Sequence, residues 1–242
     1  MSKVLHSGEE EAGFAAPLTA PIQRRSFMMY TGAAVGITAL ALSGCDDDED
    51  NNVTPGAGTV DLGSGDVGVL NYAYALEQLE AAFYAQVIAT PYAGISADET
   101  KYMTAIAKHE AIHRDFFKKA IDTAAPGKAI QGLTPDFSKI DFTSRTSVLT
   151  YAKTFEDLGV AAYNGAGKLI KDTNYLLIAG KIVSVEARHA AYIRDLINNG
   201  DFASDDIVDP TTGLDKAMEV ADVLKAAQPF VKETISGSNV GK

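Results

Sequence analysis

Apolar side chains recur at the three- and four-residue spacing of an amphipathic helix in four long segments of the chain. The first covers about residues 67–89, the second runs from 96 to about 125, the third begins at 143 or 144, and the fourth covers about 173–199. Ser96 and Glu99 have the spacing of a capping box, which marks the start of the second helix. The pattern therefore predicts an all-α fold built on four long helices.

The connections between these segments indicate how the helices are arranged. A short link joins the first segment to the second, whereas an irregular stretch over about residues 125–142 contains two prolines and two glycines. Two helical hairpins joined by one long crossover fit this order. Gly200 is expected to cap the fourth helix. Residues 214–227 are expected to form a short fifth helix, and the last dozen residues are expected to be frayed.

Six side chains suited to metal binding lie on the apolar faces of the four segments. They are Glu77, Glu110, His113, Glu156, Glu186 and His189. The second and fourth segments each carry Glu-x-x-His, which places a carboxylate and an imidazole on one face of a helix. The first and third segments each carry one of the four glutamates, Glu77 and Glu156 respectively. Four-helix bundles that hold two carboxylate-bridged iron or manganese ions use this arrangement, so the sequence predicts a dinuclear metal site.

The two halves of the chain repeat each other around this site. Glu77 is followed seven residues later by Tyr84, and Glu156 is followed seven residues later by Tyr163. Seven residues are almost two helical turns, so each Glu shares a face with its Tyr. We expect each tyrosine hydroxyl to hydrogen-bond a metal ligand of the opposite hairpin and so to fix its geometry. Simple packing of the two rings is the alternative.

The alternative to a metal site is that these residues are ordinary surface glutamates and core histidines. Burial of even one unpaired carboxylate costs several kcal/mol or shifts its pKa until the group is neutral. Two divalent cations would instead balance the negative charges of the four glutamates. Two neighbouring residues are expected to stay outside the ligand set. We expect Glu80 on the flank or at the rim of the site, because the repeat has Gly159 at the matching position, and we expect His109 either outward or behind a ligand.

Composition and charge narrow the classes of partner and cofactor. The chain has 242 residues and a net charge of −11, which argues against nucleic acid and anionic membrane surfaces as partners. Its length suits one main domain, expected over residues 67–200 with an extension over 201–242. The single cysteine excludes intrachain disulfides and iron–sulfur clusters held by cysteines.

The first 45 residues resemble an export signal rather than part of the fold. Arg24 and Arg25 begin a twin-arginine motif, and the apolar stretch that follows ends in Leu42-Ser43-Gly44-Cys45, which resembles the lipobox of bacterial lipoproteins. Cleavage there would leave a lipid-modified Cys45 as the first residue, followed by residues 46–66 as a flexible acidic and glycine-rich tether. A transmembrane anchor and a plain secretory signal are the alternatives. We therefore expect an envelope lipoprotein at the periplasmic face or the cell surface. Its lipid anchor could lie in either the inner or the outer membrane.

The ligand pattern resembles that of the ferritin-like superfamily, which includes bacterioferritin, rubrerythrin and manganese catalase. The phrase LNYAYALEQLEAAFY, from Leu70 to Tyr84, is more similar to the exported ferritin-like domain family that contains desiccation-related proteins. The resemblance covers about residues 67–199. It implies a ferritin-like four-helix bundle with a long crossover between its second and third helices and a short C-terminal helix.

The resemblance and the site chemistry together imply an oxidoreductase with two divalent ions, iron or manganese, that reacts with peroxide or dioxygen or oxidises Fe(II). Each histidine would hold one ion, and the lone glutamates Glu77 and Glu156 would be terminal ligands. Glu110 with Glu186, or another pair of the four carboxylates, would bridge. No catalytic residue beyond the ligands is expected. The alternative is a non-catalytic metal-binding or stress- and desiccation-protective envelope protein, and iron storage in a closed cage fits the tether poorly.

Overall fold

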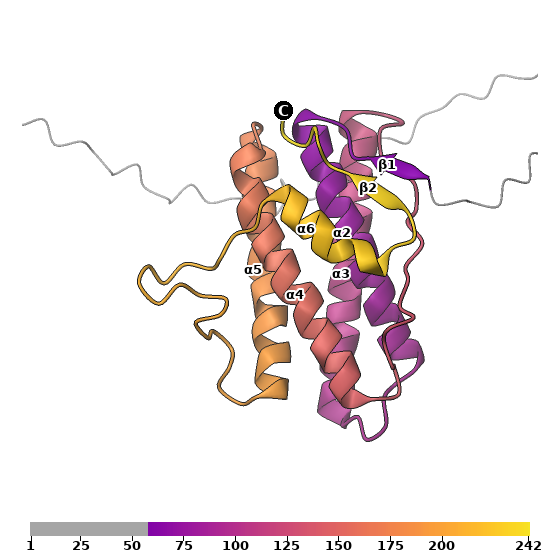
Figure 1. The fold of residues 1–242 in the computed structure, drawn as a ribbon, viewed down its shortest axis with the longest axis vertical. Coiled ribbons are helices and arrows are strands. Elements are labelled where there is room, and N and C mark those ends of the chain that lie inside the picture. The colour runs from indigo at the N-terminus through magenta and orange to yellow at the C-terminus, as the bar shows by residue number, and fades with distance from the viewer. Residues whose placement is uncertain (1–57) are drawn as a thin grey trace, which may run out of the picture. The chain divides into compact units, whose positions relative to one another are not determined.

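The computed structural model describes residues 58–242, and the predicted signal peptide, the lipobox and most of the tether lie outside these residues. Four long helices form the centre of the described part of the chain (Figure 1). They are α2 (Gly65–Ala89), α3 (Ala97–Ala124), α4 (Arg145–Ala166), which the short 3-10 helix η1 (Gly167–Leu169) follows, and α5 (Thr173–Ile197). α2 packs along α3 and α4 packs along α5, so both expected hairpins are present and the all-α prediction is confirmed.

Local sequence explains where the helices begin and end. The hydroxyl of Ser96 accepts a hydrogen bond from the N–H of Glu99, and the carboxylate of Glu99 accepts one from the N–H of Ser96, so the expected capping box is present. α5 ends at Ile197 with Asn198 as its cap residue. Gly200, expected as the cap, lies two residues further on with a φ of +90°, where a left-handed backbone turns the chain away.

α2 is buried on nearly all of its sides, unlike an ordinary outer helix of a bundle. Every residue from Gly68 to Glu77 is buried. The crossover between α3 and α4 covers part of this surface, because the N–H of Ile130 donates to the side chain of Asn71 at 3.0 Å. The ring of Phe83 packs edge-on against Phe137 in the same crossover. This cover explains why α2 carries an almost continuous apolar run instead of one apolar stripe.

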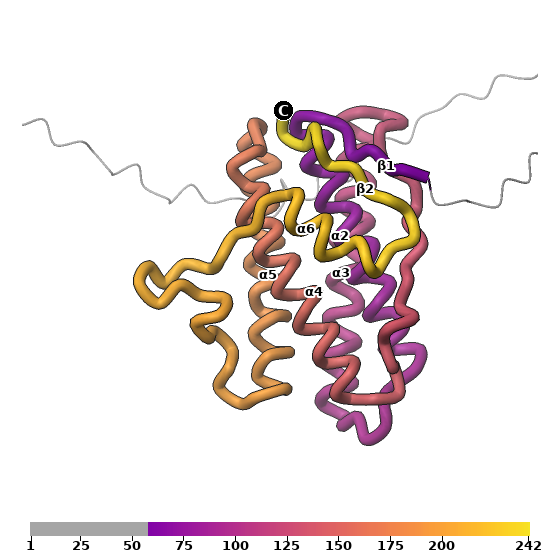
Figure 2. Tube along the Cα trace, in the orientation of Figure 1, coloured from indigo at the N-terminus to yellow at the C-terminus, as the bar shows by residue number. Residues whose placement is uncertain are grey.

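The segment after α5 folds back onto the bundle. It contains α6 (Val220–Ala227), the 3-10 helix η2 (Gln228–Phe230) and the strand β2 (Thr234–Ser236). β2 pairs in parallel with β1 (Thr59–Asp61), and Figure 2 shows the yellow C-terminal segment crossing the outside of the bundle to reach the indigo β1. The prediction of a frayed end was therefore wrong, and so was the prediction that the tether extends to residue 66. The folded unit begins before α2 and includes Val240, which is 5% exposed.

Contacts with the crossover and with α4 hold this C-terminal segment in place. The carboxylate of Glu233 accepts hydrogen bonds from the N–H and the hydroxyl of Thr134. The ring of Phe230 meets Phe155 of α4 edge-on, with ring centroids 4.8 Å apart. Strands of three residues have too few positions to show an alternating pattern, so the sequence did not reveal them. Within residues 58–242, no helix combines the length and the apolar character that crossing a bilayer requires.

Candidate metal centre

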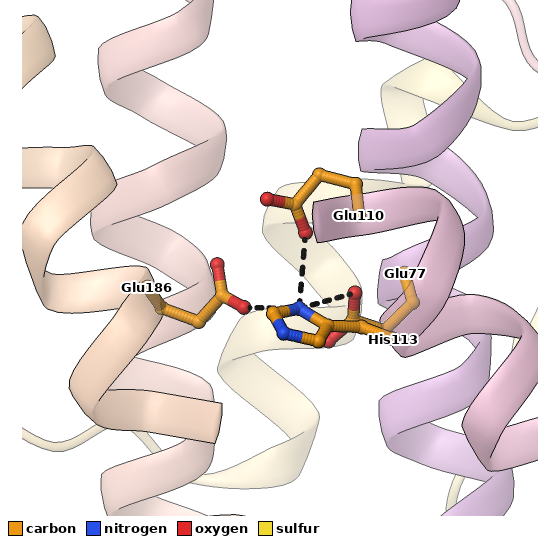
Figure 3. A group of neighbouring side chains, drawn as sticks. All are labelled: Glu77, Glu110, His113 and Glu186. Atoms are coloured by element: carbon orange, nitrogen blue, oxygen red, sulfur yellow. Dashed lines mark ion pairs between the residues drawn. The ribbon is translucent and has the colours of Figure 1, made fainter. Parts of the chain in front are cut away.

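The six predicted ligands come together in the middle of the bundle. Glu77 lies on α2, Glu110 and His113 on α3, Glu156 on α4, and Glu186 and His189 on α5. The four carboxylates are fully buried, and the imidazoles of His113 and His189 are 12% and 6% exposed. Figure 3 shows Glu77, Glu110 and Glu186 pointing toward the ring of His113 from three different helices. The four helices thus bring all six of these side chains to one place, as their helical spacing requires.

These residues form two groups that share two carboxylates. One group is Glu77, Glu110, His113 and Glu186, the other is Glu110, Glu156, Glu186 and His189, and the donor atoms within each group lie within 4.8 Å of one another. Nδ1 of His113 is 2.7 Å from Oε1 of Glu186, and Nδ1 of His189 is 2.8 Å from Oε1 of Glu110. Glu110 and Glu186 are thus common to both groups, as two bridging ligands would be, whereas Glu77 and Glu156 each belong to one group.

Eight donor atoms of these six side chains are buried without a hydrogen-bond partner. They include both carboxylate oxygens of Glu110 and of Glu186, and the Nδ1 atom of both histidines. Buried polar atoms are normally hydrogen-bonded, because leaving one unpaired costs about 1–3 kcal/mol. Donor atoms that converge at short distances without forming hydrogen bonds are suited to a shared cation. The residues therefore fit two divalent metal ions, whose charges would balance the four carboxylates.

Two tyrosines orient the terminal carboxylates. The hydroxyl of Tyr84 on α2 donates a hydrogen bond to Oε1 of Glu156 on α4, and the hydroxyl of Tyr163 on α4 donates one to Oε1 of Glu77 on α2. Both hydrogen bonds join opposite hairpins, as expected from the repeat. Burial, followed by the neighbouring carboxylates, raises the pKa of both hydroxyls well above the usual value, so both remain donors. The second oxygen of each terminal carboxylate stays free for the centre.

Burial and neighbouring charges strongly shift the pKa values of the side chains at this site. Burial raises the pKa of Glu156 to about 8. Burial alone would lower the pKa of His113 and His189, but the surrounding carboxylates outweigh it and raise both values to about 12. Burial would likewise raise the pKa of Glu110, whereas the two imidazolium groups beside it lower the value to about 2. Protons on the imidazoles can thus balance the carboxylates, and a metal ion must displace them.

Glu80 is a fifth buried carboxylate beside the centre, and its expected place at the rim was wrong. Its side chain is 3% exposed. A Cβ atom added to Gly159 of α4 would lie 2.9 Å from Oε1 of Glu80, so the glycine makes the space that this carboxylate occupies. Burial, followed by the charges of the four ligand carboxylates, raises the pKa of Glu80 well above its usual value. The sequence held a signal for this placement, because Glu80 and Gly159 occupy matching positions of the repeat.

His109 contacts the site from outside, which is one of the two placements expected for it. Its Nδ1 atom is 2.9 Å from Nε2 of His189, on the side of the ligand ring that faces away from the carboxylates. Burial and the positive charge of His189 lower the pKa of His109. A neutral His109 ring can accept a hydrogen bond from His189.

Comparison with known proteins agrees with this geometry. A family model described as a ferritin-like domain matches residues 65–199, which is more than half of the chain. The matched region contains all four long helices and all six predicted ligands. No match is found among curated proteins. The extent of the family match and the four-helix architecture together show that the chain belongs to the ferritin-like domain family.

Proposed function

We propose that this protein is an exported ferritin-like protein that holds two iron or manganese ions and carries out redox chemistry with peroxide or dioxygen, or oxidises Fe(II). The observation that carries the proposal is the sharing of Glu110 and Glu186 by two groups of buried donor atoms. Two carboxylates placed between two imidazoles would hold two cations close together, an arrangement that a purely structural metal site does not need.

The proposed ligand sets follow from the two groups. The first ion would be held by Glu77 and His113 and the second by Glu156 and His189, with the two shared glutamates common to both. When bound, a pair of iron or manganese ions supplies one-electron steps and reactivity toward oxygen species. Carboxylate and imidazole suit both metals, so the ligand types support iron and manganese equally.

The chain's own residues would keep the ligands in place and limit access of water. Tyr84 and Tyr163 hold one oxygen of each terminal carboxylate, which leaves the other turned toward the centre. The ring of Phe83 packs edge-on against Tyr84, and the ring of Phe117 lies beside Tyr163. An apolar shell of this kind strengthens the electrostatic interactions inside it, because little water is present to screen them.

Metal analysis and turnover measurements test the proposal. We expect the mature protein, purified from its native host, to contain about two iron or manganese ions per chain, as the donor groups indicate. It should turn over peroxide or Fe(II), and Glu186→Gln should abolish this activity. Glu219→Gln changes an exposed glutamate and is the matched control. Protein that binds neither metal, in its native host or after addition of Fe(II) or Mn(II), would contradict the proposal.

A non-catalytic metal-binding or stress-protective role is the second candidate. The observation that favours it is the complete burial of all four carboxylates, with the imidazole of His113 only 12% exposed. A closed site of this kind would hold metal but admit substrate slowly. In this case the protein would bind two ions and gain stability from them without turning over peroxide, dioxygen or Fe(II).

The twin-arginine motif and the lipobox at Cys45 support export and attachment to a membrane through lipid. Both motifs lie outside the described residues. The twin-arginine route carries folded proteins, so it allows the proposed metal to be loaded in the cytoplasm before export. A small oxidant or Fe(II) would then reach the protein in the cell envelope, where reactive oxygen species enter from outside.

A further inference from the structure

The repeat that builds the metal centre is broken beside its histidines. Aligning Glu110-Ala-Ile-His113 with Glu186-Ala-Arg-His189 places His109 of α3 opposite Val185 of α5. Of the two helices that carry Glu-x-x-His, only α3 therefore has an additional imidazole next to this pair. That imidazole contacts His189 on the other helix.

The two rings are joined edge to edge. Nδ1 of His109 lies 2.9 Å from Nε2 of His189, the ring centroids are 5.1 Å apart, and the ring planes differ by only 10°. The centroid separation is too long for face-to-face stacking at this nitrogen–nitrogen distance. It is the separation of two nearly coplanar imidazoles whose nitrogen atoms face each other. This is the geometry of a well-aligned hydrogen bond.

Metal binding by His189 would fix the direction of this hydrogen bond. Nδ1 of His189 faces the carboxylates of Glu110, Glu186 and Glu156 at 2.8, 3.4 and 3.5 Å. A nitrogen that binds a metal ion carries no proton, so the proton of the neutral ring lies on Nε2 and is donated to His109. The hydrogen bond would then hold both the tautomer and the orientation of the ligand ring.

His113 has no equivalent support. Among the hydrogen bonds of residues 58–242, none involves Nε2 of His113. The matching position on α5 is Val185, which has no side-chain acceptor. The imidazole of His113 is also twice as exposed as that of His189, at 12% against 6%. The ring of His189 is therefore held by a hydrogen bond at its outer nitrogen, whereas the ring of His113 has no such partner among residues 58–242.

We infer that the two metal positions are unequal, and that His109 makes the position at His189 the tighter one, so that it fills first. The inference rests on the proposed dinuclear metal site. A ligand ring that is already oriented loses less freedom on binding, and donation from Nε2 makes Nδ1 a stronger base. Removal of such a partner typically lowers metal affinity about 10–100-fold. His109 is thus a positioning residue for one ion only.

Calorimetric titration of the metal-free mature protein with Mn(II) tests the inference. We expect two binding steps of different affinity, and His109→Ala should weaken the tighter step about 10–100-fold while leaving the other unchanged. His109→Asn should restore the tighter step, because its side-chain oxygen can accept the same proton. His189→Ala should remove the tighter step and His113→Ala the weaker one. Lys108→Ala, an exposed neighbour on α3, is the matched control and should change neither step.

A second readout separates positioning from a general loss of structure. In Co(II)-loaded protein the Nε2 proton of His189 should give a paramagnetically shifted NMR signal, and its exchange with D2O should become faster in His109→Ala. Two equal binding steps in the unaltered protein would overturn the inference, and so would equal weakening of both steps by His109→Ala. No uptake of Mn(II), Fe(II) or Co(II) by the unaltered protein would overturn the proposed function as well.

Discussion

The hydroxyl of Tyr84 on α2 donates a hydrogen bond of 2.5 Å to Glu156 on α4 and thereby connects the two helical hairpins at the metal centre. Tyr163 on α4 makes the reciprocal hydrogen bond to Glu77 on α2. Each hairpin thus orients a terminal ligand that belongs to the other. The complete site depends on the docking of both halves, and neither half can orient its own lone glutamate.

Replacing Tyr84 by Phe should keep both metal ions bound while lowering metal affinity or turnover. The change removes one hydroxyl and frees Oε1 of Glu156, and the loss of such a partner typically costs about 10–100-fold. Metal content and peroxide or Fe(II) turnover of the mature protein are the measurements. Tyr151→Phe on α4 is the control, because Tyr151 packs through its ring against Phe155. Equal effects of the two variants would contradict the assigned role.

Replacing a shared glutamate should remove more metal from the protein than replacing a terminal one. Glu110→Gln removes a charged ligand common to both groups and should deplete both ions, whereas Glu77→Gln affects one group and should deplete about one. Gln keeps the side-chain volume, so packing changes little. Elemental analysis per chain gives the answer. Loss of the same number of ions in both variants would show that Glu110 is not shared.

Stability should depend on pH in opposite directions with and without metal. The folded-state pKa of Glu156 is raised from 4.5 to about 8, and that of His113 and His189 from 6.5 to about 12. A group whose pKa is higher in the folded than in the unfolded state stabilises the metal-free fold. This contribution is complete at pH values below the unfolded-state pKa and is lost as pH rises through the folded-state pKa. The metal-free protein should therefore lose stability as pH rises from about 4.5 to about 8 through Glu156, and more steeply above about 6.5, where both histidines add to the loss.

Metal binding should reverse this trend, because a metal ion competes with protons for the same donor atoms. The increase in melting temperature on adding Mn(II) should grow as pH rises across this range. The pKa of Glu110 is lowered to about 2, so its contribution is lost only in stronger acid and does not disturb the comparison. An increase that shrinks with rising pH would indicate that metal does not displace protons from the site.

The effect of Gly159→Ala on the free energy of unfolding should change sign with the residue at position 80. With Glu80 present, the added Cβ would lie 2.9 Å from Oε1 of Glu80, so a buried carboxylate must move and the protein should be destabilised. In a Glu80→Ala background the same change should stabilise by about 0.5–1 kcal/mol, because Ala favours the helix over Gly. Urea unfolding of the four proteins measures the coupling. The same effect in both backgrounds would show that Gly159 does not make space for Glu80.

Cys45→Ser should release the protein from membranes. The predicted lipobox would make this cysteine the lipid-modified residue, and the substitution removes the only thiol in the chain. Fractionation of the native host followed by mass spectrometry of the mature N-terminus is the measurement. Retention of the variant in the membrane fraction, or an unmodified N-terminus at another residue in the unaltered protein, would contradict lipoprotein processing.

The sequence predicted the convergence of the six side chains because helical spacing is a local property. His113 lies three positions after Glu110, so the pair must share a face wherever the helix packs. The cross-hairpin hydrogen bond of Tyr84 was predictable because the repeat supplied an equivalent in the other half. The sequence left two placements open for His109, outward or behind a ligand, because its contact with His189 depends on the distance between α3 and α5. No local pattern fixes that distance.

The helical pattern misplaced Glu80, although the matching Gly159 held a signal for its burial, and it gave no sign of the terminal strands. An amphipathic pattern assumes a solvent-facing side, but α2 is covered by the crossover and by α4, so a carboxylate off the expected stripe is also buried. β1 and β2 have three residues each and find partners at opposite ends of the domain. Their pairing is a long-range event that leaves no periodicity in either segment.

The parallel pairing of Thr59 with Thr234 also sets an order in time. Each helical hairpin can assemble from neighbouring stretches while the chain is being synthesised, because its contacts are local. β1 emerges before any of these helices, yet its partner does not exist until almost the whole domain has left the ribosome. β1 therefore has no partner strand while the four long helices are being synthesised. Closure of this small sheet is therefore the last step in the assembly of the domain, and a docked β1 marks a chain whose domain has been completed.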